Sequence, residues 1–371
     1  MSARLRVVVD PHFRAMDEIF TPADRAELHE LVDVVWGLDR PMPRDDFLTE
    51  VADADAVVFG GWRYGADALD AATPRLRALL EVAGGHEHAD LDYDRCLDRG
   101  IAVGSCAPAF GPAVSEMALA LALSSMRGVT EADRLMRTGS EQWLHAGNAG
   151  NTSLQGASVG FVGCGRISVH LQRLLEPFGA RVLGYDPPIS DEILLSRGIV
   201  PASLETIMAD ARVVFILAAP TANNHGLISR RLLSMLAPDQ TLVLLSRARL
   251  VDFDALVELV AQCRFRAAID VYPDEPLDPS HPVRTLDWAV LAPHLAGAMP
   301  AALFEIGRMV VADLQALAQG RRPTVMQYLT PENRVGLLQG GAVHRDLAGS
   351  TGAPTGTETA ETSGIEAKGG P

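Results

Sequence analysis

The sequence predicts an α/β protein built from two doubly wound parallel sheets, and three observations support this prediction. Over residues 4–104, short apolar runs alternate with segments of helical period. A second series of the same kind begins at Val159. The chain has 371 residues, a length typical of about two domains.

The first half of the chain contains the elements of one sheet. Its apolar runs predict strands at residues 5–9, 56–59, 76–82 and 101–103. Helical periods at residues 23–32 and 66–72 lie between these runs, as βαβ units require. A long helical pattern then covers residues 114–136, and the polar residues 139–151 predict a connecting loop.

The second half repeats the alternation. Beyond Val159, strands are predicted at residues 181–186, 213–217, 242–245, 267–271 and 289–291. A helical pattern at residues 301–318 follows, and we expect it to pack back on the first sheet. From about residue 336 the composition is rich in Gly, Thr, Ser, Ala, Glu and Pro, so we expect a disordered tail over 336–371.

Composition excludes several classes of function. The apolar residues, 48% of the chain, are dispersed, and we expect no run that approaches the length of a membrane span. A net charge of −15 argues against binding to nucleic acid. The four cysteines lie far apart in sequence, which favours a reducing cytoplasm. A single lysine, Lys368 in the expected tail, excludes Schiff-base and Walker-type phosphate chemistry.

A glycine motif between two strands indicates a dinucleotide site. Gly163 permits a tight turn after a buried strand, and Gly165 lacks the side chain that would keep a pyrophosphate from the backbone. The helix that opens here directs free N–H groups toward the phosphates. The third glycine of such motifs is replaced by Ser168, which is small enough to keep helix and strand close.

The expected cofactor is NAD. Asp186 falls roughly twenty residues after the motif, where a carboxylate can bind both ribose hydroxyls. No basic residue follows it, because the next two are Pro187 and Pro188, so a 2′-phosphate would meet a carboxylate without a cation. We therefore expect a Rossmann-type cofactor domain over residues 116–297. It would be inserted into a flavodoxin-like substrate domain made of residues 1–115 and 298–335.

Three candidate catalytic residues each follow an apolar strand, and such strands end at the cofactor crevice of a doubly wound sheet. Arg247 could hold a carboxylate in two hydrogen bonds, Glu275 lies in a proline-stiffened loop, and His294 has apolar neighbours. Singly, each has a simple alternative: a surface arginine, a solvated acidic turn and a structural histidine.

Together the three match the needs of 2-keto acid reduction. That reaction needs a cation to bind the carboxylate and polarise the carbonyl, and a proton donor that works near neutral pH. It also needs an anion that orients the donor and favours its protonated form. Arg247, His294 and Glu275 would fill these roles in that order.

In their order these segments resemble the D-isomer-specific 2-hydroxyacid dehydrogenase family, which includes phosphoglycerate, glycerate and hydroxypyruvate enzymes. The resemblance extends from Val57 to about Gln319. Three motifs carry it: Ser246-Arg-Ala-Arg-Leu-Val-Asp252, Asp270-Val-Tyr-Pro-Asp-Glu-Pro276 and Pro293-His-Leu-Ala-Gly297. It implies an Arg247, Glu275 and His294 triad. It also implies further cofactor contacts at Arg166, Ile167, Pro220, Thr221, Ser246, Asp270 and Gly297.

The chain departs from the family pattern at the substrate loop. Gly84 and Gly85 could still offer N–H groups to a substrate carboxylate, but His86 and His88 are unusual there. Trp62 or Arg63, after another strand, is a further candidate for substrate contact, with packing at the domain surface as the alternative. The polar loop accounts for these histidines without a metal ion, and we predict none.

The combined prediction is an NAD-dependent enzyme that interconverts a D-2-hydroxy acid and its 2-keto acid. We expect a cytoplasmic homodimer with a small-molecule substrate and no nucleic-acid or membrane partner. One alternative is a non-catalytic NAD(H)-sensing protein that resembles corepressors on the same fold. Another is a dehydrogenase of formate or phosphite, and Glu275 disfavours the formate type, which carries an amide there.

Overall fold

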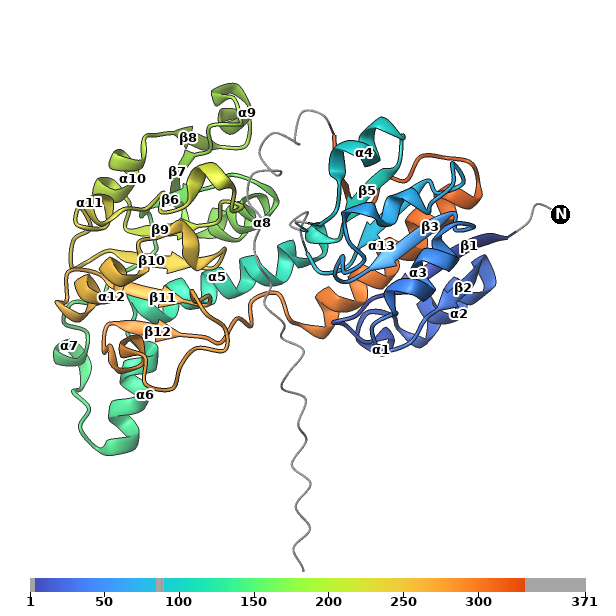
Figure 1. Cartoon of the computed structure of the whole chain (residues 1–371). Coiled ribbons are helices and arrows are strands. Elements are labelled where there is room, and N and C mark those ends of the chain that lie inside the picture. The colour runs from blue at the N-terminus through green and yellow to red at the C-terminus, as the bar shows by residue number, and fades with distance from the viewer. Residues whose placement is uncertain (1–3, 85–87, 89, 331–371) are drawn as a thin grey trace, which may run out of the picture.

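The computed structural model describes residues 4–84, 88 and 90–330. These residues form one six-stranded and one seven-stranded sheet, in two bodies that lie side by side (Figure 1). The chain passes from the first body to the second along helix α5 (Gly111–Met126) and returns just before helix α13 (Pro300–Ala318). The expected tail over residues 336–371 lies outside the described residues.

The first sheet has the strand order β13-β5-β4-β3-β1-β2. Neighbouring strands are parallel except β13, which pairs antiparallel with β5. Without β13 this is the flavodoxin-like order, which confirms that prediction. The strands are β1 (Leu5–Asp10), β2 (Val32–Trp36), β3 (Ala56–Phe59), β4 (Ala78–Glu81), β5 (Ala102–Ser105) and β13 (Gln327–Tyr328).

Helices cover both faces of the first sheet, so its strands are buried on both sides. In β1, Val7 and Val9 join the core beneath α1, α2 and α13, whereas Val8 joins the core beneath α3, η1 and α4. This alternation follows from the two-residue period of a strand. The other elements are α1 (Met16–Ile19), α2 (Pro22–Leu31), α3 (Arg44–Val51), α4 (Tyr93–Asp98) and the 3₁₀ turns η1 (Ala66–Asp70) and η2 (Ala107–Phe110).

The second sheet is entirely parallel and has the order β12-β11-β10-β9-β6-β7-β8. This is the Rossmann order with one more strand at the β11 edge, and it confirms the predicted fold class. The order reverses between β6 and β9, which places a ligand crevice at the carboxyl ends of the strands. The strands are β6 (Ser158–Val162), β7 (Arg181–Tyr185), β8 (Ile199–Pro201), β9 (Val213–Ile216), β10 (Thr241–Leu244), β11 (Arg266–Ile269) and β12 (Ala289–Leu291).

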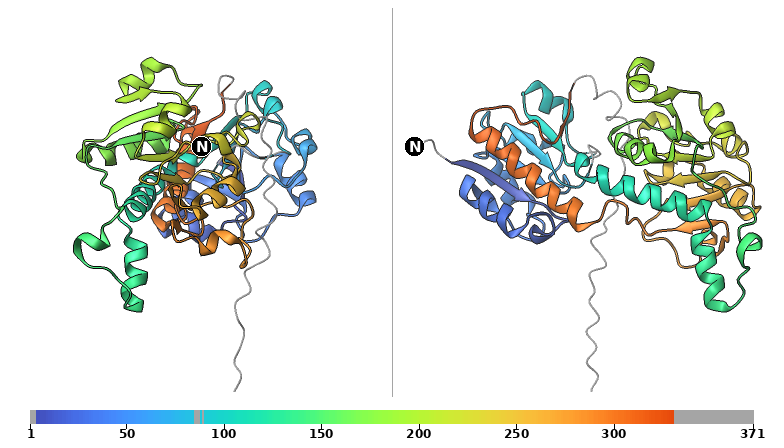
Figure 2. Two further views of the ribbon diagram at one scale, coloured as in Figure 1. Left: turned by 90° about the vertical axis from the view of Figure 1, so that its left-hand side faces the viewer. Right: turned by 180° about the vertical axis from the view of Figure 1, so that it is seen from behind.

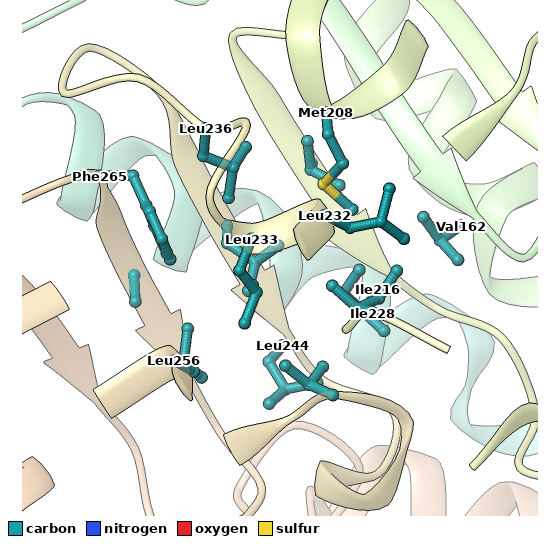
Figure 3. Packing of buried hydrophobic residues seen from close by; sticks show 14 of the residues in the cluster. Val162, Met208, Ile216, Ile228, Leu232, Leu233, Leu236, Leu244, Leu256 and Phe265 are labelled. Carbon is teal, nitrogen blue, oxygen red and sulfur yellow. The ribbon is translucent and has the colours of Figure 1, made fainter. Parts of the chain in front are cut away.

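Two apolar cores cover the faces of the second sheet. One packs β9 residues Val214 and Ile216 against helices that contribute Met208, Leu232 and Leu256 (Figure 3). The other packs Val213 and Phe215 against α5, α8 and α9. The helices around this sheet are α8 (Arg166–Leu175), α9 (Asp191–Ser196), α10 (Leu204–Asp210), α11 (Arg230–Leu233) and α12 (Phe253–Ala261), with 3₁₀ turns η3 (Glu176–Phe178), η4 (Ala222–Asn224), η5 (Ala248–Leu250) and η6 (Pro282–Thr285).

One helix corrects the expectation about apolar length. The 20 residues Ala107–Met126 are long and apolar enough to cross a membrane by length and composition alone, and half of that window is buried within the protein. Val114, Ala118 and Leu121 of α5 belong to the core of the second sheet. The helix is apolar because it packs on this sheet.

The long helix predicted over residues 114–136 is wrong in its continuity. It is broken into α5 and α6 (Val129–Thr138) at Gly128, which has φ +61°, a conformation that continues no right-handed helix. Helix α6, the loop after it and α7 (Leu144–Gly147) form an arm, residues 129–147, that projects beyond the second sheet (Figures 1 and 2). Neither α6 nor α7 contains a buried residue.

Candidate active site

Three neighbouring strands deliver the candidate catalytic residues to one edge of the second sheet. Arg247 follows β10, Glu275 follows β11 and His294 follows β12. The register pairs Leu244 with Ile269 and Ile269 with Leu291, so the three strands end at the same level. Because parallel strands share one carboxyl edge, residues far apart in sequence meet there.

His294 and Glu275 form a direct hydrogen-bonded pair. Nδ1 of His294 lies 2.6 Å from Oε2 of Glu275. The other carboxylate oxygen, Oε1, accepts the backbone N–H of Tyr272 at 2.9 Å, which fixes the carboxyl group. The opposite ring nitrogen of His294, Nε2, makes no hydrogen bond with the residues that the structure describes, so it is available to a substrate.

The loop that carries His294 is held by Asp270. His294 has φ +53°, a backbone conformation that non-glycine residues rarely adopt. Such a conformation persists only where surrounding contacts hold it in place. The backbone carbonyl of Asp270 accepts the N–H of His294 at 2.8 Å. Its buried carboxylate accepts the N–H groups of Leu295 at 2.8 Å and Ala296 at 3.1 Å. Asp270 accepts three hydrogen bonds from this loop, and they maintain the unusual backbone at His294.

The electrostatics separate the two carboxyl groups of this site. Burial raises the pKa of Asp270 above its ordinary value, although the N–H groups of Leu295 and Ala296 oppose the shift. Burial also acts to raise the pKa of Glu275. This effect is outweighed by hydrogen bonds from His294 and Tyr272 and by the positive charges of His294 and Arg247, so the pKa of Glu275 is lowered. Of the two carboxyl groups, Glu275 is therefore the one that is more stable as an anion.

Arg247 lies close to this pair without contacting it directly. Its guanidinium Nη1 donates to the carbonyl of Ser246 at 2.8 Å, and its charge contributes to the lowered pKa of Glu275. Ser246 itself donates its hydroxyl to the carbonyl of Ala218. A guanidinium has five N–H donors, so this conformation leaves several for a substrate carboxylate.

The glycine turn forms an open cradle at the start of α8. A Cβ at Gly163 would overlap the backbone of Ala218, and this residue has φ +96°, so the turn requires glycine. A Cβ at Gly165 would meet nothing within 4 Å, and this open space lies at the N-terminus of α8. The hydroxyl of buried Ser168 donates to the carbonyl of Gly165 at 2.6 Å. The residues present thus fit a pyrophosphate.

The glycine turn beside Asp186, where the adenosine ribose is expected, also contacts a cation that sequence reasoning missed. Asp186 follows β7, and its Oδ2 accepts the N–H of Cys164 at 2.7 Å. Nη1 of Arg197, from the turn between α9 and β8, donates to the carbonyl of the same Cys164 at 2.9 Å. The expectation that no cation stands near Asp186 is therefore wrong. Arg197 lies eleven positions downstream, and folding brings it back to the glycine turn.

The remaining cofactor candidates follow the carboxyl ends of strands in the same sheet. Arg166 and Ile167 open α8, and the carbonyl of Ile167 accepts the hydroxyl of Ser115 in α5 at 2.9 Å. Pro220 and Thr221 follow β9, and Thr221 N–H donates to Asn224 Oδ1 at 2.7 Å. Gly297 ends the His294 loop.

Phe110 brings the two sides of the site together. A Cβ at Gly84 would lie 3.0 Å from the ring of Phe110, and a Cβ at Gly297 would lie 3.1 Å from it. The ring therefore separates the loop after β4 from the loop after β12. The substrate loop and the His294 loop thus face each other across one side chain from η2.

Two of the residues expected to contact the substrate already have partners within the protein. Trp62 is 6% exposed, packs among Phe47, Phe59 and Tyr64, and donates its indole N–H to the carbonyl of Gly65, so the packing alternative holds. The N–H of Gly84 already donates to Oε1 of buried Glu81 at 2.7 Å. Gly85 and His86 lie outside the described residues.

Glu81 and His88 are an unexpected feature of the substrate loop. Glu81 ends β4 and also accepts the hydroxyl of Ser105 at 2.9 Å. Nε2 of His88 lies 3.8 Å from Oε1 of Glu81, and the N–H of Trp62 donates to Nδ1 of His88 at 3.4 Å. The buried carboxylate could not be inferred from sequence, since it ends an apolar strand pattern.

Comparisons with known proteins identify the family of this chain. Residues 119–296 match the model of the D-isomer specific 2-hydroxyacid dehydrogenase family, NAD binding domain. A glyoxylate reductase of Thermofilum pendens is 30% identical over 310 residues, which cover 81% of this chain and 89% of that protein. The chain belongs to this family. It is therefore an NAD(P)-dependent oxidoreductase of 2-hydroxy and 2-keto acids.

Two further relatives show the same relationship. A D-3-phosphoglycerate dehydrogenase of Mycobacterium tuberculosis is 30% identical over 329 residues, covering 88% of this chain but 59% of that longer protein. The crystal structure of a phosphoglycerate oxidoreductase from Rhizobium etli matches with a TM-score of 0.79 and 30% identity, over 89% of this chain and all of that one. The two-body architecture is thus that of the family.

Proposed function

We propose that this dehydrogenase reduces a small 2-keto acid to the D-2-hydroxy acid with NADH, and that His294 is its general acid and base. The observation that carries the proposal is the 2.6 Å contact between His294 Nδ1 and Glu275 Oε2 at the ends of two neighbouring strands. The contact orients the ring, leaves Nε2 for the substrate and places an anion behind the proton donor.

Each side chain then has a separate task. Arg247 binds the substrate carboxylate and polarises the adjacent carbonyl, for which its planar fork is suited. His294 donates the proton on Nε2 to the carbonyl oxygen as the alcohol forms, and Glu275 stabilises the imidazolium beforehand. The bound nicotinamide supplies the hydride. In the reverse direction, neutral His294 removes the hydroxyl proton.

We expect the substrate to carry no phosphate. Arg63 is the arginine of the loop after β3, and its guanidinium donates to the buried carboxylate of Asp10 at 2.7 Å and to the carbonyl of His12 at 2.8 Å. Its charge is therefore neutralised within the protein. A phosphate at this position would have to compete with a buried carboxylate, which is costly to leave unpaired.

A substrate panel tests the proposal. Purified protein with NADH is mixed with glyoxylate, hydroxypyruvate, phenylpyruvate and 3-phosphohydroxypyruvate, and NADH absorbance is followed. Steady turnover with an unphosphorylated acid is expected. Tight NADH binding without turnover on any of the four would refute the proposal and favour the NAD(H)-sensing alternative.

Asp186 supports a preference for NADH over NADPH. The carboxylate can accept the ribose hydroxyls but repels a 2′-phosphate, which carries roughly −1.5 to −2 charges near neutral pH. Because only Oδ2 is engaged by Cys164, Oδ1 remains for the ribose. The closeness of Arg197 reduces this repulsion without removing the preference.

The arm supports a homodimer. Trp143 and Leu144 are 68% and 85% exposed, and Val129 and Met136 of α6 are also exposed. An amphipathic helix with no buried residue is unusual in a monomer, and several exposed apolar side chains on one arm favour a protein partner. A second copy of this chain would cover it symmetrically. We also propose a cytoplasmic location, in which the four free cysteines would stay reduced.

A further inference from the structure

Arg197 and Asp186 attach to the two backbone groups of a single residue. The carboxylate accepts the N–H of Cys164 at 2.7 Å, and the guanidinium donates to its carbonyl at 2.9 Å. Cys164 lies between Gly163 and Gly165, so both charges stand at the turn that begins the cofactor cradle. They come from different segments, the end of β7 and the turn before β8.

Both charges affect the pKa of the Cys164 thiol. Burial raises its pKa to about 12, Asp186 contributes in the same direction, and Arg197 opposes them. A carboxylate and a guanidinium that act on one sulfur atom lie in one small region. This region is the adenosine end of the crevice, where the ribose 2′ position of a dinucleotide lies.

The guanidinium of Arg197 is not neutralised. Over residues 4–84, 88 and 90–330, no carboxylate lies within ion-pair distance of it, and its one hydrogen bond is to the Cys164 carbonyl. The residue is exposed. Four of its five N–H donors are therefore available to an anion, and a phosphate accepts such donors in pairs.

We propose that Arg197 binds the 2′-phosphate of NADPH, so that the enzyme uses NADPH as a second cofactor while Asp186 keeps NADH preferred. The proposal rests on the proposed placement of the adenosine ribose at Asp186. Removing Asp186 would then convert the preference, because the cation remains and the repelling carboxylate is gone. The alternative is a purely structural role, in which Arg197 only stabilises the glycine turn through its hydrogen bond.

Two nucleotides that differ only in the 2′-phosphate separate these roles. Binding of adenosine 5′-monophosphate and adenosine 2′,5′-bisphosphate is measured by calorimetry on the full-length protein and on Arg197→Met, Arg197→Lys and Asp186→Ala. Arg173→Met removes an exposed arginine near the far end of α8, so it controls for the change in net charge.

The expected results follow from charge. Arg197→Met should weaken the bisphosphate about tenfold or more, the loss of one charge-assisted contact, and leave the monophosphate within about twofold. Arg197→Lys should restore most of the loss, and Arg173→Met should change neither. Asp186→Ala should strengthen the bisphosphate and weaken the monophosphate.

Equal weakening of both nucleotides in Arg197→Met, or no change in either, would overturn the proposal and leave a bracing role. Failure of the wild type to bind the bisphosphate at millimolar concentration would also overturn it. Neither result touches the proposed reaction, which is measured separately by turnover with NADH. Absence of that turnover, with normal nucleotide discrimination, would instead count against the proposed function alone.

Discussion

Replacing Glu275 with glutamine isolates the charge behind His294. In the protein, Oε2 accepts from His294 Nδ1 and Oε1 accepts from Tyr272 N–H at 2.9 Å, so both oxygens act as acceptors. Glutamine has one acceptor and one donor group. Its one oxygen can accept from His294 Nδ1 or from the Tyr272 N–H, but not from both in the present arrangement. The variant therefore loses the anion and disturbs one of two hydrogen bonds without a change in volume.

The expected magnitude comes from the charge-assisted bond. Hydrogen bonds to charged groups contribute about 1.5–3 kcal/mol, and we take the lower half of this range because the side chains of Glu275 and His294 are 28% and 42% exposed. At 1.36 kcal/mol per tenfold, kcat/KM for the keto acid should fall roughly 13- to 45-fold. The dissociation constant of NADH should stay within about twofold.

Steady-state kinetics and NADH fluorescence titration measure the two quantities. A Glu275→Gln variant with kcat/KM within threefold of the wild type would refute the reasoning, as would a loss of equal size in NADH affinity. A pH series gives an independent check. The pKa of Glu275 is lowered on folding from an ordinary value of 4.5, so its stabilising contribution is full above that pH and is lost as the pH falls through the lower folded value. The difference in melting temperature between wild type and variant should vanish on strong acidification.

Two further predictions concern the cradle and the arm. Gly165→Ala should fold normally, since a Cβ there meets nothing within 4 Å, yet weaken NADH at least tenfold by blocking close approach of the pyrophosphate. Gly163→Ala should instead destabilise the protein by roughly 2–5 kcal/mol, from positive φ and overlap with Ala218; equal melting temperatures for the two variants would contradict this. Leu144→Asp in the arm should produce a monomer in sedimentation velocity. Leu195→Asp, at another exposed leucine, on α9, should not, and an unchanged dimer in both would remove the arm from the interface.

The fold class could be predicted from the sequence because buried strands have a recognisable sequence pattern. Strands such as Ala56–Phe59 and Val213–Ile216 are short apolar runs bounded by polar turns, which is typical of sheets covered on both faces. Strand β2 was missed because it begins at Val32, directly after Leu31 ends α2, and it lies at the sheet edge with partly exposed residues. Its pattern therefore merged with that of the helix.

Site residues that directly follow a strand could be predicted from the sequence. Contacts that form only when folding brings separate segments together could not. Arg247, Glu275 and His294 each follow a strand, and parallel register then places them at one edge. Arg197 contacts the glycine turn from the turn before β8, and no local sequence pattern indicates this contact. Trp62 was misread because a strand end also supports core packing. The aromatic rings of Phe47, Phe59 and Tyr64 decide that case only in three dimensions.

The most direct test of the account is a single substitution, His294→Ala, with turnover and NADH affinity measured on the same preparation. General acid–base groups contribute roughly 10²–10⁴-fold to rate, and a loss of that size is expected with NADH binding almost unchanged. Retained turnover, or a parallel loss of NADH binding, would contradict the assignment of the imidazole as the group that moves the proton.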